Sequence, residues 1–385
     1  MGPLHGIKVL DLSRILAGPW ATQCLADFGA TVWKVEKPGA GDDTRHWGPP
    51  WMKDAGGRDT GEAAYYLSSN RGKYSLAIDF TRAAGQKLIR GLAQRADVLI
   101  ENFRVGTLAR YGLGYKDLGA LNQRLIYCSI SAFGQDGPEA GGAGYDAMIQ
   151  GMSGLMSVTG VPDGEPGAGP IKVGVAVSDL ISGMYALSAV LGALYEREQS
   201  GQGQAIDLAL LDAQIAALAN QGLNYLVSGL PPGRRGTAHP NIVPYQAFAT
   251  ADGYLMLAIG NDRQFASFCT VAGRPELAAD ERFRANAGRV SNRAALPEVV
   301  GDAGLYSDPD DAESLTAALE RLIGDAHLRT SLAQRGLDRA SQFTWTGTAR
   351  GVRRAWEDAL LARRQRTPAL AGAQPGVHSR NAHRH

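Results

Sequence analysis

The sequence predicts an α/β protein with a large domain built on a parallel sheet, followed by a smaller α+β domain. Between residues 6 and 134, short apolar segments alternate with helical segments, which is typical of parallel strands joined by crossover helices. From 144 to 223 the pattern becomes mainly helical. The 385 residues are enough for two domains with a sizeable core, so we expect a Rossmann-like sheet and a second unit.

Strands and helices alternate through the first third of the chain. Segment 6–13 is a short buried strand, 17–30 is a helix that starts with Ala-Gly-Pro, and 31–39 is a second strand. Together they form a βαβ unit. The same alternation predicts strands over 74–80, 97–103 and 125–134 and a helix over 83–96.

Longer helices are predicted in the middle of the chain. They cover 144–160 and 178–201, and a short strand followed by a helix covers 205–229. A loop rich in Pro, Gly and basic residues (230–248), a turn and strand (250–260) and a helix (262–273) come next. The predicted boundaries are 1–224 for the large domain, 225–294 for the start of the small domain, 295–366 for a helical tail and 367–385 for a disordered C-terminus.

Composition and charge indicate a soluble globular protein. Hydrophobic residues make up 44% of the chain, charged residues make up 20%, and the net charge is +1. This balance gives no reason to expect a nucleic-acid or membrane partner, and no apolar stretch is predicted to span a bilayer. The three cysteines are widely spaced and form no metal-binding pattern, which indicates a reduced, cytoplasmic protein without a metal site.

Basic residues lie near the predicted strand ends. Lys37, Lys73, Arg104 and Arg110 stand where α/β sheets hold ligands, and they would suit a ligand that carries phosphates. The Ala-Gly-Pro segment at 17–19 adds backbone amides at a helix start, where anions bind well. By spacing alone, a solvated surface is the simpler interpretation of these residues.

A single aspartate, Asp179, stands in the apolar segment VGVAVSDLISGMYAL. Burial of an unpaired carboxylate is costly, so the residue needs a role. It could cap the helix that follows, where amide hydrogen bonds and the helix dipole would keep it ionised, or it could be a nucleophile. The residue type by itself favours the cap.

Five longer segments, taken together, carry a resemblance that changes the choice between these two roles of Asp179. They are LDLSRILAGPWATQCLADFGATVWKVEKPGAGDDTR, NRGKYSLAIDF, ADVLIENFRVGTLARYGLGYKDLGALNQRLIYCSISAFGQDGP, GYDAMIQGMSGLMSVTG and VGVAVSDLISGMYALSAVLGALYEREQSGQGQAIDLALLDA. In this order the chain resembles family III coenzyme A transferases, which include formyl-CoA transferase, the carnitine CoA-transferases and α-methylacyl-CoA racemase. The resemblance covers about residues 1–294. The segments RRGTAHPNIVPYQAF and DGYLMLAIGNDRQF look most like the succinate–hydroxymethylglutarate branch.

The resemblance implies that Asp179 is the catalytic nucleophile and that no cofactor is tightly bound. The substrates would be coenzyme A thioesters and a free carboxylic acid. Arg234, Arg235 and His239 are candidate contacts for the distal carboxylate of a dicarboxylate such as succinate. The implied coenzyme A contacts are Leu16, Ala17, Lys37, Asn70, Arg71, Gly72, Lys73, Asn102, Phe103, Arg104, Arg110, Ser131, Ala132, Phe133 and Gly134.

The implied reaction moves coenzyme A between two acids through a covalent aspartyl anhydride and an aspartyl-CoA thioester. The racemase branch instead uses paired bases, and its histidine position falls on Tyr145. A tyrosine, with an ordinary pKa of about 10, is a poor base at neutral pH, which favours transfer. Two alternatives stay open: acyl-CoA racemisation or isomerisation, and an inactive or unstable chimera that keeps coenzyme A binding.

The tail departs from the family pattern. Residues 295–366 resemble the C-terminal end of a glycosyltransferase with two Rossmann-like domains, and no donor site accompanies them. Members of the coenzyme A transferase family form interlocked dimers, so the resemblance implies a homodimer. Loss of the family's returning C-terminal segment predicts reduced stability or an incomplete fold.

Overall fold

The computed structural model describes residues 2–250, 253–272 and 274–293, together with a few single residues between 317 and 331. The chain divides into two compact units, one ending at Gly236 and the other beginning at Thr237. This division falls later than the expected boundary at 224/225, because helix α9 (Asn220–Ser228) runs across that point. Apart from the few single residues, the predictions for 295–366 and 367–385 lie outside the described residues.

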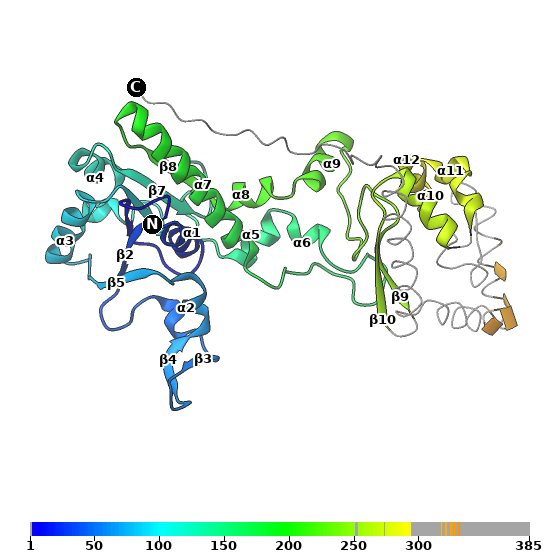
Figure 1. The fold of residues 1–385 in the computed structure, drawn as a ribbon, viewed down its shortest axis with the longest axis horizontal. Coiled ribbons are helices and arrows are strands. Elements are labelled where there is room, and N and C mark those ends of the chain that lie inside the picture. Colours follow the sequence, from blue (N-terminus) through cyan, green and yellow to red (C-terminus); the bar gives the residue numbers. More distant parts are fainter. Residues whose placement is uncertain are drawn as a thin grey trace, which may run out of the picture. The chain divides into compact units, whose positions relative to one another are not determined.

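The first unit contains a six-stranded sheet whose strands are all parallel (Figure 1). Its strands are β1 (Lys8–Asp11), β2 (Thr31–Glu36), β5 (Lys73–Ala77), β6 (Val98–Glu101), β7 (Ile126–Ser131) and β8 (Ala205–Ala209). The spatial order is β5-β2-β1-β6-β7-β8, which is the Rossmann order when only these strands are counted. The direction of the order reverses between β1 and β6. Ligands of such sheets bind outside the carboxyl ends of the strands at this point.

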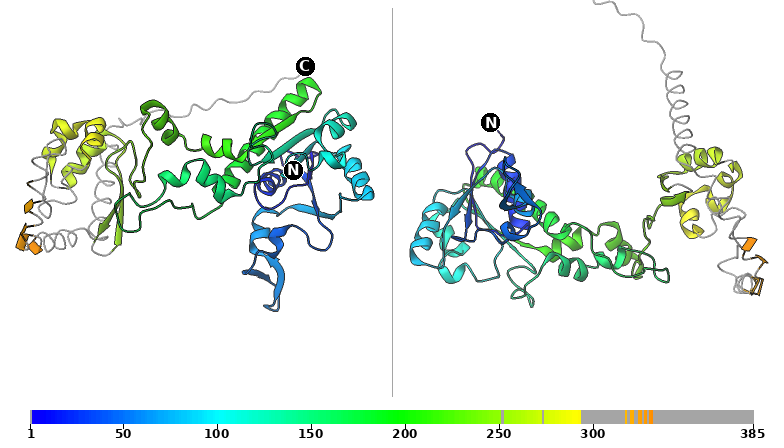
Figure 2. Two further views of the ribbon diagram at one scale, coloured as in Figure 1. Left: turned by 180° about the vertical axis from the view of Figure 1, so that it is seen from behind. Right: turned by 90° about the horizontal axis from the view of Figure 1, so that it is seen from below.

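Helices cover both faces of the sheet, which explains why its strands are apolar on both sides. The helices are α1 (Ala17–Asp27) and α7 (Val177–Ser200) on one face, and α3 (Ala83–Ala93) and α4 (Tyr115–Leu121) on the other (Figures 1 and 2). In β1, Val9 packs in a core shared with α1 and α7, whereas the next residue, Leu10, packs with α3 and α4. The strands predicted for the first third of the chain are therefore confirmed.

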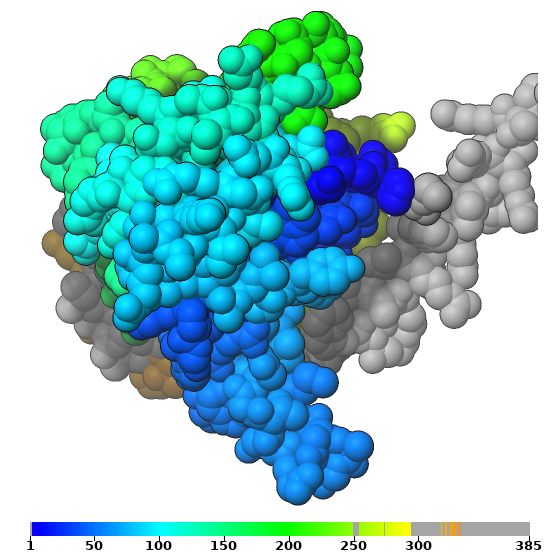
Figure 3. Space-filling view, turned by 90° about the vertical axis from the view of Figure 1, so that its left-hand side faces the viewer, coloured from blue at the N-terminus to red at the C-terminus, as the bar shows by residue number. Residues whose placement is uncertain are grey.

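A hairpin that the sequence did not predict projects from the first unit. It consists of β3 (Trp51–Lys53) and β4 (Asp59–Ala63), which pair antiparallel between the short helix η1 (Asp43–His46) and α2 (Ala64–Ser69). Figure 3 shows the hairpin as a blue lobe that stands out from the surface. Its sequence is rich in Gly and charged residues and lacks the apolar alternation that identifies a strand.

The helices between β7 and the end of the first unit are shorter than the sequence predicts. The single helix expected over 144–160 is split into α5 (Asp146–Met152) and α6 (Leu155–Val158) by Gly154, whose φ is 88°. The helix expected to reach 229 is split into α8 (Leu210–Ala216) and α9 at Ala219, whose φ is 46°. A residue with positive φ interrupts the helical backbone, and apolar periodicity does not reveal it.

Helix α7 is confirmed close to its expected bounds. By length and composition it is long and apolar enough to cross a membrane, although the sequence was expected to hold no such stretch. Within the unit, Ala186 and Val190 are buried in the core. A Cβ added at Gly183 would lie 2.7 Å from the carbonyl oxygen of Ala17, so α1 and α7 are in close contact. The apolar character of α7 is that of a core helix.

The second unit has its own small core. Phe265, Cys269 and Phe283 are buried there, and the guanidinium of the buried Arg289 donates to the carbonyl oxygen of Val243 at 2.7 Å. The first strand of this unit begins inside 230–248, which the sequence predicted as a loop. The elements are β9 (Tyr245–Thr250), β10 (Gly253–Ala258), α10 (Asp262–Val271), η3 (Pro275–Ala278), α11 (Glu281–Arg284) and α12 (Asn286–Ser291).

Candidate active site

Asp179 borders a cavity of about 180 Å³ at the carboxyl edge of the sheet. The walls come from the loop between β1 and α1, the turn after β6, the end of β7 and the start of α5 and α7. Residues that line it include Leu16, Ala17, Asn102, Phe103, Arg104, Ser131, Ala132, Tyr145, Asp146 and Asp179. The reversal point of the sheet and the start of α7 therefore meet at one cavity.

The carboxylate of Asp179 accepts no hydrogen bond from any residue that the structure describes. Its helix begins at Val177 and has Ala176 as the N-cap residue, so Asp179 is not the N-cap that the sequence left open. Burial, together with the neighbouring carboxylate of Asp146, raises the pKa of Asp179 to about 7. A carboxylate without hydrogen-bond donors keeps its lone pairs available for attack on a carbonyl carbon.

Asp146, the first residue of α5, caps α7 in place of Asp179. Its Oδ1 accepts hydrogen bonds from the backbone N–H groups of Ser178 at 2.8 Å and Asp179 at 3.4 Å. Its Oδ2 accepts a hydrogen bond from Nε2 of Gln150 at 2.7 Å. Asp146 thus fixes the start of α7 and keeps a second carboxylate beside Asp179.

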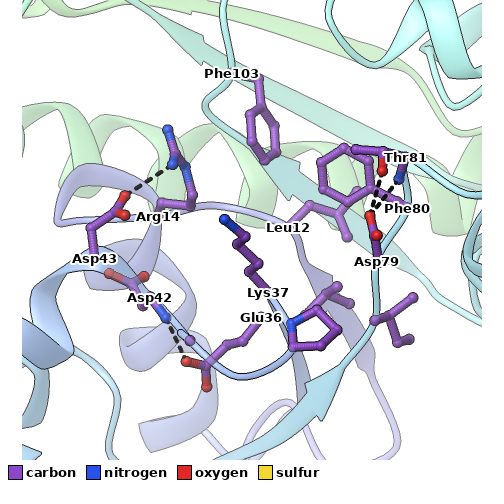
Figure 4. Close-up of a pocket in the computed structure, with 14 residues that line it drawn as sticks. Leu12, Arg14, Glu36, Lys37, Asp42, Asp43, Asp79, Phe80, Thr81 and Phe103 are labelled. Atoms are coloured by element: carbon purple, nitrogen blue, oxygen red, sulfur yellow. Dashed lines mark hydrogen bonds and ion pairs between the residues drawn. The ribbon is translucent and has the colours of Figure 1, made fainter.

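A second cavity, of about 320 Å³, opens at the ends of β1, β2, β5 and β6 (Figure 4). Lys37 reaches into its middle, and its ammonium group forms no ion pair with a described residue. The side chains of Leu12, Phe80 and Phe103 provide apolar wall. An amine beside aromatic rings suits a ligand that combines phosphates with a flat ring.

Carboxylates also border this second cavity, but each is paired with a cation of the protein, so they do not cancel the charge of Lys37. The pairs are Glu36 with Arg45, Asp42 with Lys34, Asp43 with Arg14 and Asp79 with Arg82. The Asp42–Lys34 pair is almost fully buried, with 1% of each side chain exposed. The net effect is a cavity with one unpaired cation at its centre.

The two cavities meet at Arg14 and Phe103, which line both of them. The guanidinium carbon of Arg14 lies 5.3 Å from the centre of the Phe103 ring, and its Nη1 is 2.9 Å from a carboxylate oxygen of Asp43. Figure 4 shows Arg14 turned toward Asp43 beside this ring. The two adjoining cavities, with Lys37 in one and Asp179 in the other, lie along the same sheet edge and are called the path below.

The structure brings about half of the expected coenzyme A contacts to this path. Those that line a cavity are Leu16, Ala17, Lys37, Asn102, Phe103, Arg104, Ser131 and Ala132. Those that line neither cavity are Asn70, Arg71, Gly72, Lys73, Arg110, Phe133 and Gly134. Arg71 forms an exposed ion pair with Asp27, and Arg110 is exposed on the short helix η2 (Ala109–Tyr111).

Lys73 has a structural role in place of the predicted phosphate contact. Its side chain is 2% exposed, and its ammonium group bonds to Asp11 Oδ2 at 3.1 Å, the Pro19 carbonyl at 2.9 Å and Asn70 Oδ1 at 2.9 Å. An ammonium group has three N–H donors, so none remains for a ligand. Burial lowers the pKa of Lys73 to about 8, although the charge of Asp11 opposes this shift.

The three residues expected to contact a distal carboxylate line neither cavity. Arg234 already forms an ion pair with Asp163, and Arg235 is exposed in the same segment. His239 belongs to the second unit, where its Nδ1 accepts a hydrogen bond from the backbone N–H of Asn241 at 3.0 Å. Their contact with substrate stays a prediction.

Sequence reasoning missed Arg14, the link from Asp146 to α7, and Tyr65. The pKa of Tyr65 is raised by burial and by the carboxylates of Asp179 and Asp146, so this phenol lies near both of them. Its ring packs edge to face on Trp47, with 5.1 Å between ring centres. The sequence around Tyr65 carries no signal, because two adjacent tyrosines are equally well explained by core packing.

The site brings together side chains that can react or bind, Asp179 and Tyr145 among them. In the part of the chain that the structure describes, no group of three His, Cys, Asp or Glu residues could hold a metal ion. The reactive group is the carboxylate of Asp179, which lies in the first turn of α7. Tyr145 lies in the same cavity and is 71% exposed. The arrangement suits covalent attack on an acyl group.

Comparison with known proteins identifies a family and several relatives of this chain. The model of CoA-transferase family III matches residues 4–334, which is further than the resemblance seen in the sequence. A succinate–glutarate CoA-transferase of Agrobacterium fabrum is 53% identical over 298 residues, which are 77% of this chain and 73% of that protein. A succinyl-CoA:glutarate CoA-transferase of Mus musculus is 46% identical over 78% of this chain, which spans 66% of the mouse protein. The crystal structure of a CAIB/BAIF family protein from Brucella suis has a TM-score of 0.66 and 48% identity, and the match covers 86% of this chain and 88% of that one.

Proposed function

The chain belongs to CoA-transferase family III, which makes it a CoA-transferase enzyme, and from this premise we propose that it moves coenzyme A between succinate and a second dicarboxylic acid such as glutarate. Two relatives named for succinate and glutarate support this choice of acids. The observation that carries the proposed chemistry is the unbonded carboxylate of Asp179 at the end of a path that begins at Lys37.

Asp179 performs the covalent step in this proposal. Its carboxylate oxygen attacks the thioester carbonyl carbon, the C–S bond breaks, and coenzyme A leaves as a thiolate, so that a mixed anhydride forms. The thiolate then attacks the aspartyl carbonyl, which releases the first acid as a carboxylate and leaves an aspartyl-CoA thioester. The acceptor carboxylate attacks this thioester, and the same two steps run in reverse. One thioester replaces another, so no ATP is consumed.

The remaining cavity residues would bind and orient the thioester. Lys37 and Arg104 supply cations for the phosphates, and Phe103 offers a ring for the nucleotide base. Leu16 and Ala17 form a wall beside Asp179, where the acyl group must arrive. With a pKa of about 7, Asp179 is ionised in a large part of the molecules at neutral pH, as a nucleophile requires.

Mass spectrometry tests this assignment directly. The full chain is incubated with succinyl-CoA without an acceptor acid, and a coenzyme A adduct is expected on the peptide that contains Asp179. The Asp179→Ala variant should form no adduct and lose transfer by about three orders of magnitude or more, while it still binds coenzyme A. The matched control is Asp207→Ala, because Asp207 accepts a backbone hydrogen bond from Gln135 outside the cavity. An adduct on another residue, or full turnover without Asp179, would refute the mechanism.

Homodimeric assembly and a cytoplasmic location remain predictions from the sequence. Exposed apolar side chains on α7 and α9, such as Tyr195, Leu226 and Val227, are 73–84% exposed and are what a second copy could cover. Size-exclusion chromatography with light scattering measures the mass of the full chain. A stable, cooperatively unfolding dimer would confirm the assembly and would contradict the reduced stability expected from the unusual tail.

A further inference from the structure

We propose that Asn102 is a positioning residue that ties the loop between β1 and α1 to the turn after β6, and so aligns the two cavities for acyl transfer. The inference rests on the proposed function, because it concerns the same site. It assigns Asn102 a different role from the direct coenzyme A contact that the resemblance implies. The role follows from the bonds that its side chain makes within the protein.

Both ends of the Asn102 amide are bonded to one residue. Oδ1 accepts a hydrogen bond from the backbone N–H of Arg14 at 2.8 Å, and Nδ2 donates to the backbone carbonyl of Arg14 at 2.8 Å. The Asn102 side chain thus pairs with both backbone groups of Arg14, as a residue of a neighbouring strand would. It continues the pairing of β1 with β6 beyond the last residues of those strands.

The loop held in this way is strained. Ile15 has a φ of 69°, a left-handed conformation that a β-branched residue rarely adopts. Such a conformation persists only where the surrounding structure enforces it. Other bonds also hold the loop: the ammonium group of Lys34 donates to the Ser13 carbonyl at 3.0 Å, and the backbone N–H of Ile15 approaches the Asp42 carboxylate at 3.3 Å. The side chain of Asn102 is what joins the loop to the turn after β6.

The two segments joined by Asn102 are the ones that shape the path. The loop contributes Arg14, Leu16 and Ala17 to the cavity walls, and the turn contributes Phe103. The turn is itself fixed by Glu101, whose Oε2 accepts a hydrogen bond from the backbone N–H of Phe103 at 2.8 Å. Without Asn102, Ile15 can relax and the two segments can separate. The thioester would then no longer be held in register with Asp179.

The chain contains a matched control for this role. Asn122 also bridges backbone groups: its Nδ2 donates to the carbonyls of Ala93 and Ala96, both at 2.9 Å, and its Oδ1 accepts from the backbone N–H of Arg124 at 3.1 Å. It lies just before β7, at the amino edge of the sheet, away from both cavities. Loss of Asn122 removes the same kind of interaction without touching the path.

The experiment compares Asn102→Ala with Asn122→Ala in the full chain. Both variants should melt at lower temperatures than the wild type. Only Asn102→Ala should lower kcat/KM for succinyl-CoA, by roughly 10- to 100-fold, with the KM for the acceptor acid unchanged. Hydrogen exchange of the peptide spanning 12–20 should become faster in Asn102→Ala alone. Asn102→Asp keeps the acceptor for the Arg14 N–H but places a carboxylate oxygen against the Arg14 carbonyl, so its kcat/KM should fall at least as far as that of Asn102→Ala.

The result that overturns the inference is a folded Asn102→Ala variant whose kcat/KM stays within about twofold of the wild type, or an equal loss in Asn122→Ala. If Asn102→Ala does not fold, Asn102→Asp is compared with Asn122→Asp under the same criterion. If the wild type transfers no coenzyme A, the proposed function fails. Hydrogen exchange and the dissociation constant of free coenzyme A then decide the role of Asn102 by themselves.

Discussion

Two carboxylates of the first unit, the fully buried Asp11 and the half-buried Asp179, have opposite surroundings. Burial would raise the pKa of Asp11, but the charges of Lys73 and Lys34 and two hydroxyl hydrogen bonds lower it to about 2. Asp179 accepts no hydrogen bond from the described residues and faces Asp146, and its pKa is raised to about 7. Burial acts in the same direction on both groups, so the partners decide the difference.

The difference separates a structural carboxylate from a reactive one. The hydrogen bonds and charges around Asp11 stabilise the ionised form in the fold, and in doing so they occupy its lone pairs. Asp179 keeps its lone pairs free, and the folded protein is less stable for it at neutral pH. A site built for nucleophilic attack therefore costs stability that the rest of the core supplies.

The largest effect is expected when the Asp11 cluster loses its cation. Lys73→Met leaves the fully buried Asp11 without its ion-pair partner and should lower the free energy of unfolding by about 3–5 kcal/mol. Denaturant titration of the full chain measures this change. Arg71→Met is the control, because the Arg71–Asp27 pair is exposed and screened by water, so its loss should change stability far less. Equal losses in the two variants would show that burial does not separate these two ion pairs.

A smaller effect of opposite sign is expected at Asp179. Because its pKa is higher in the folded chain than in the unfolded chain, the folded state binds its proton more tightly, and stability falls as the pH rises toward and through about 7. Asp179→Asn removes this penalty and should raise the free energy of unfolding by about 1–3 kcal/mol at pH 8.5. The gain should shrink at pH 5. Denaturant titration at the two pH values measures it, and a variant that is less stable than the wild type at pH 8.5 would show the reasoning to be wrong.

The smallest effect concerns Asp146, the like charge beside the nucleophile. Asp146→Asn keeps an acceptor for the Ser178 amide and removes a negative charge, so the pKa of Asp179 should fall, by roughly 0.5–1 unit. Transfer requires ionised Asp179, so kcat/KM should rise with pH, and the midpoint of that rise should move to lower pH in the variant. Asp207→Asn serves as control with an unmoved midpoint. A midpoint that stays in place or moves upward in Asp146→Asn argues against electrostatic coupling of the two aspartates.

Local periodicity was enough to predict most of the sheet. Apolar segments such as 6–13 and 125–134 become strands because both faces of the sheet are covered, so that β7 is buried throughout and β1 is buried from Val9 to Asp11. The same reasoning failed where one backbone angle decides the outcome. Gly154 and Ala219 end helices that apolar spacing would continue, and the hairpin formed by β3 and β4 carries too few apolar residues to be recognised.

The site was harder to predict because its bonds join residues that are far apart in the chain. Lys73 looks like a phosphate contact from its place near a strand end, but it is bonded to Asp11, 62 positions earlier. Asp146 caps a helix that begins more than 30 residues later. Neither partner can be found from spacing, because only the packing of the sheet brings them together.

The amino-acid sequence by itself determined the fold class, the parallel strands of the first half, and the single carboxylate within an apolar helix start. Those features depend on periodicity and residue type, which are local properties of the chain. The tertiary structure decided which charges are satisfied and which are free. It paired Lys73 with Asp11, left Asp179 unbonded beside Asp146, and made Asn102 a bridge between two loops. Protonation and reactivity depend on neighbours in space, and those exist only after the chain has folded.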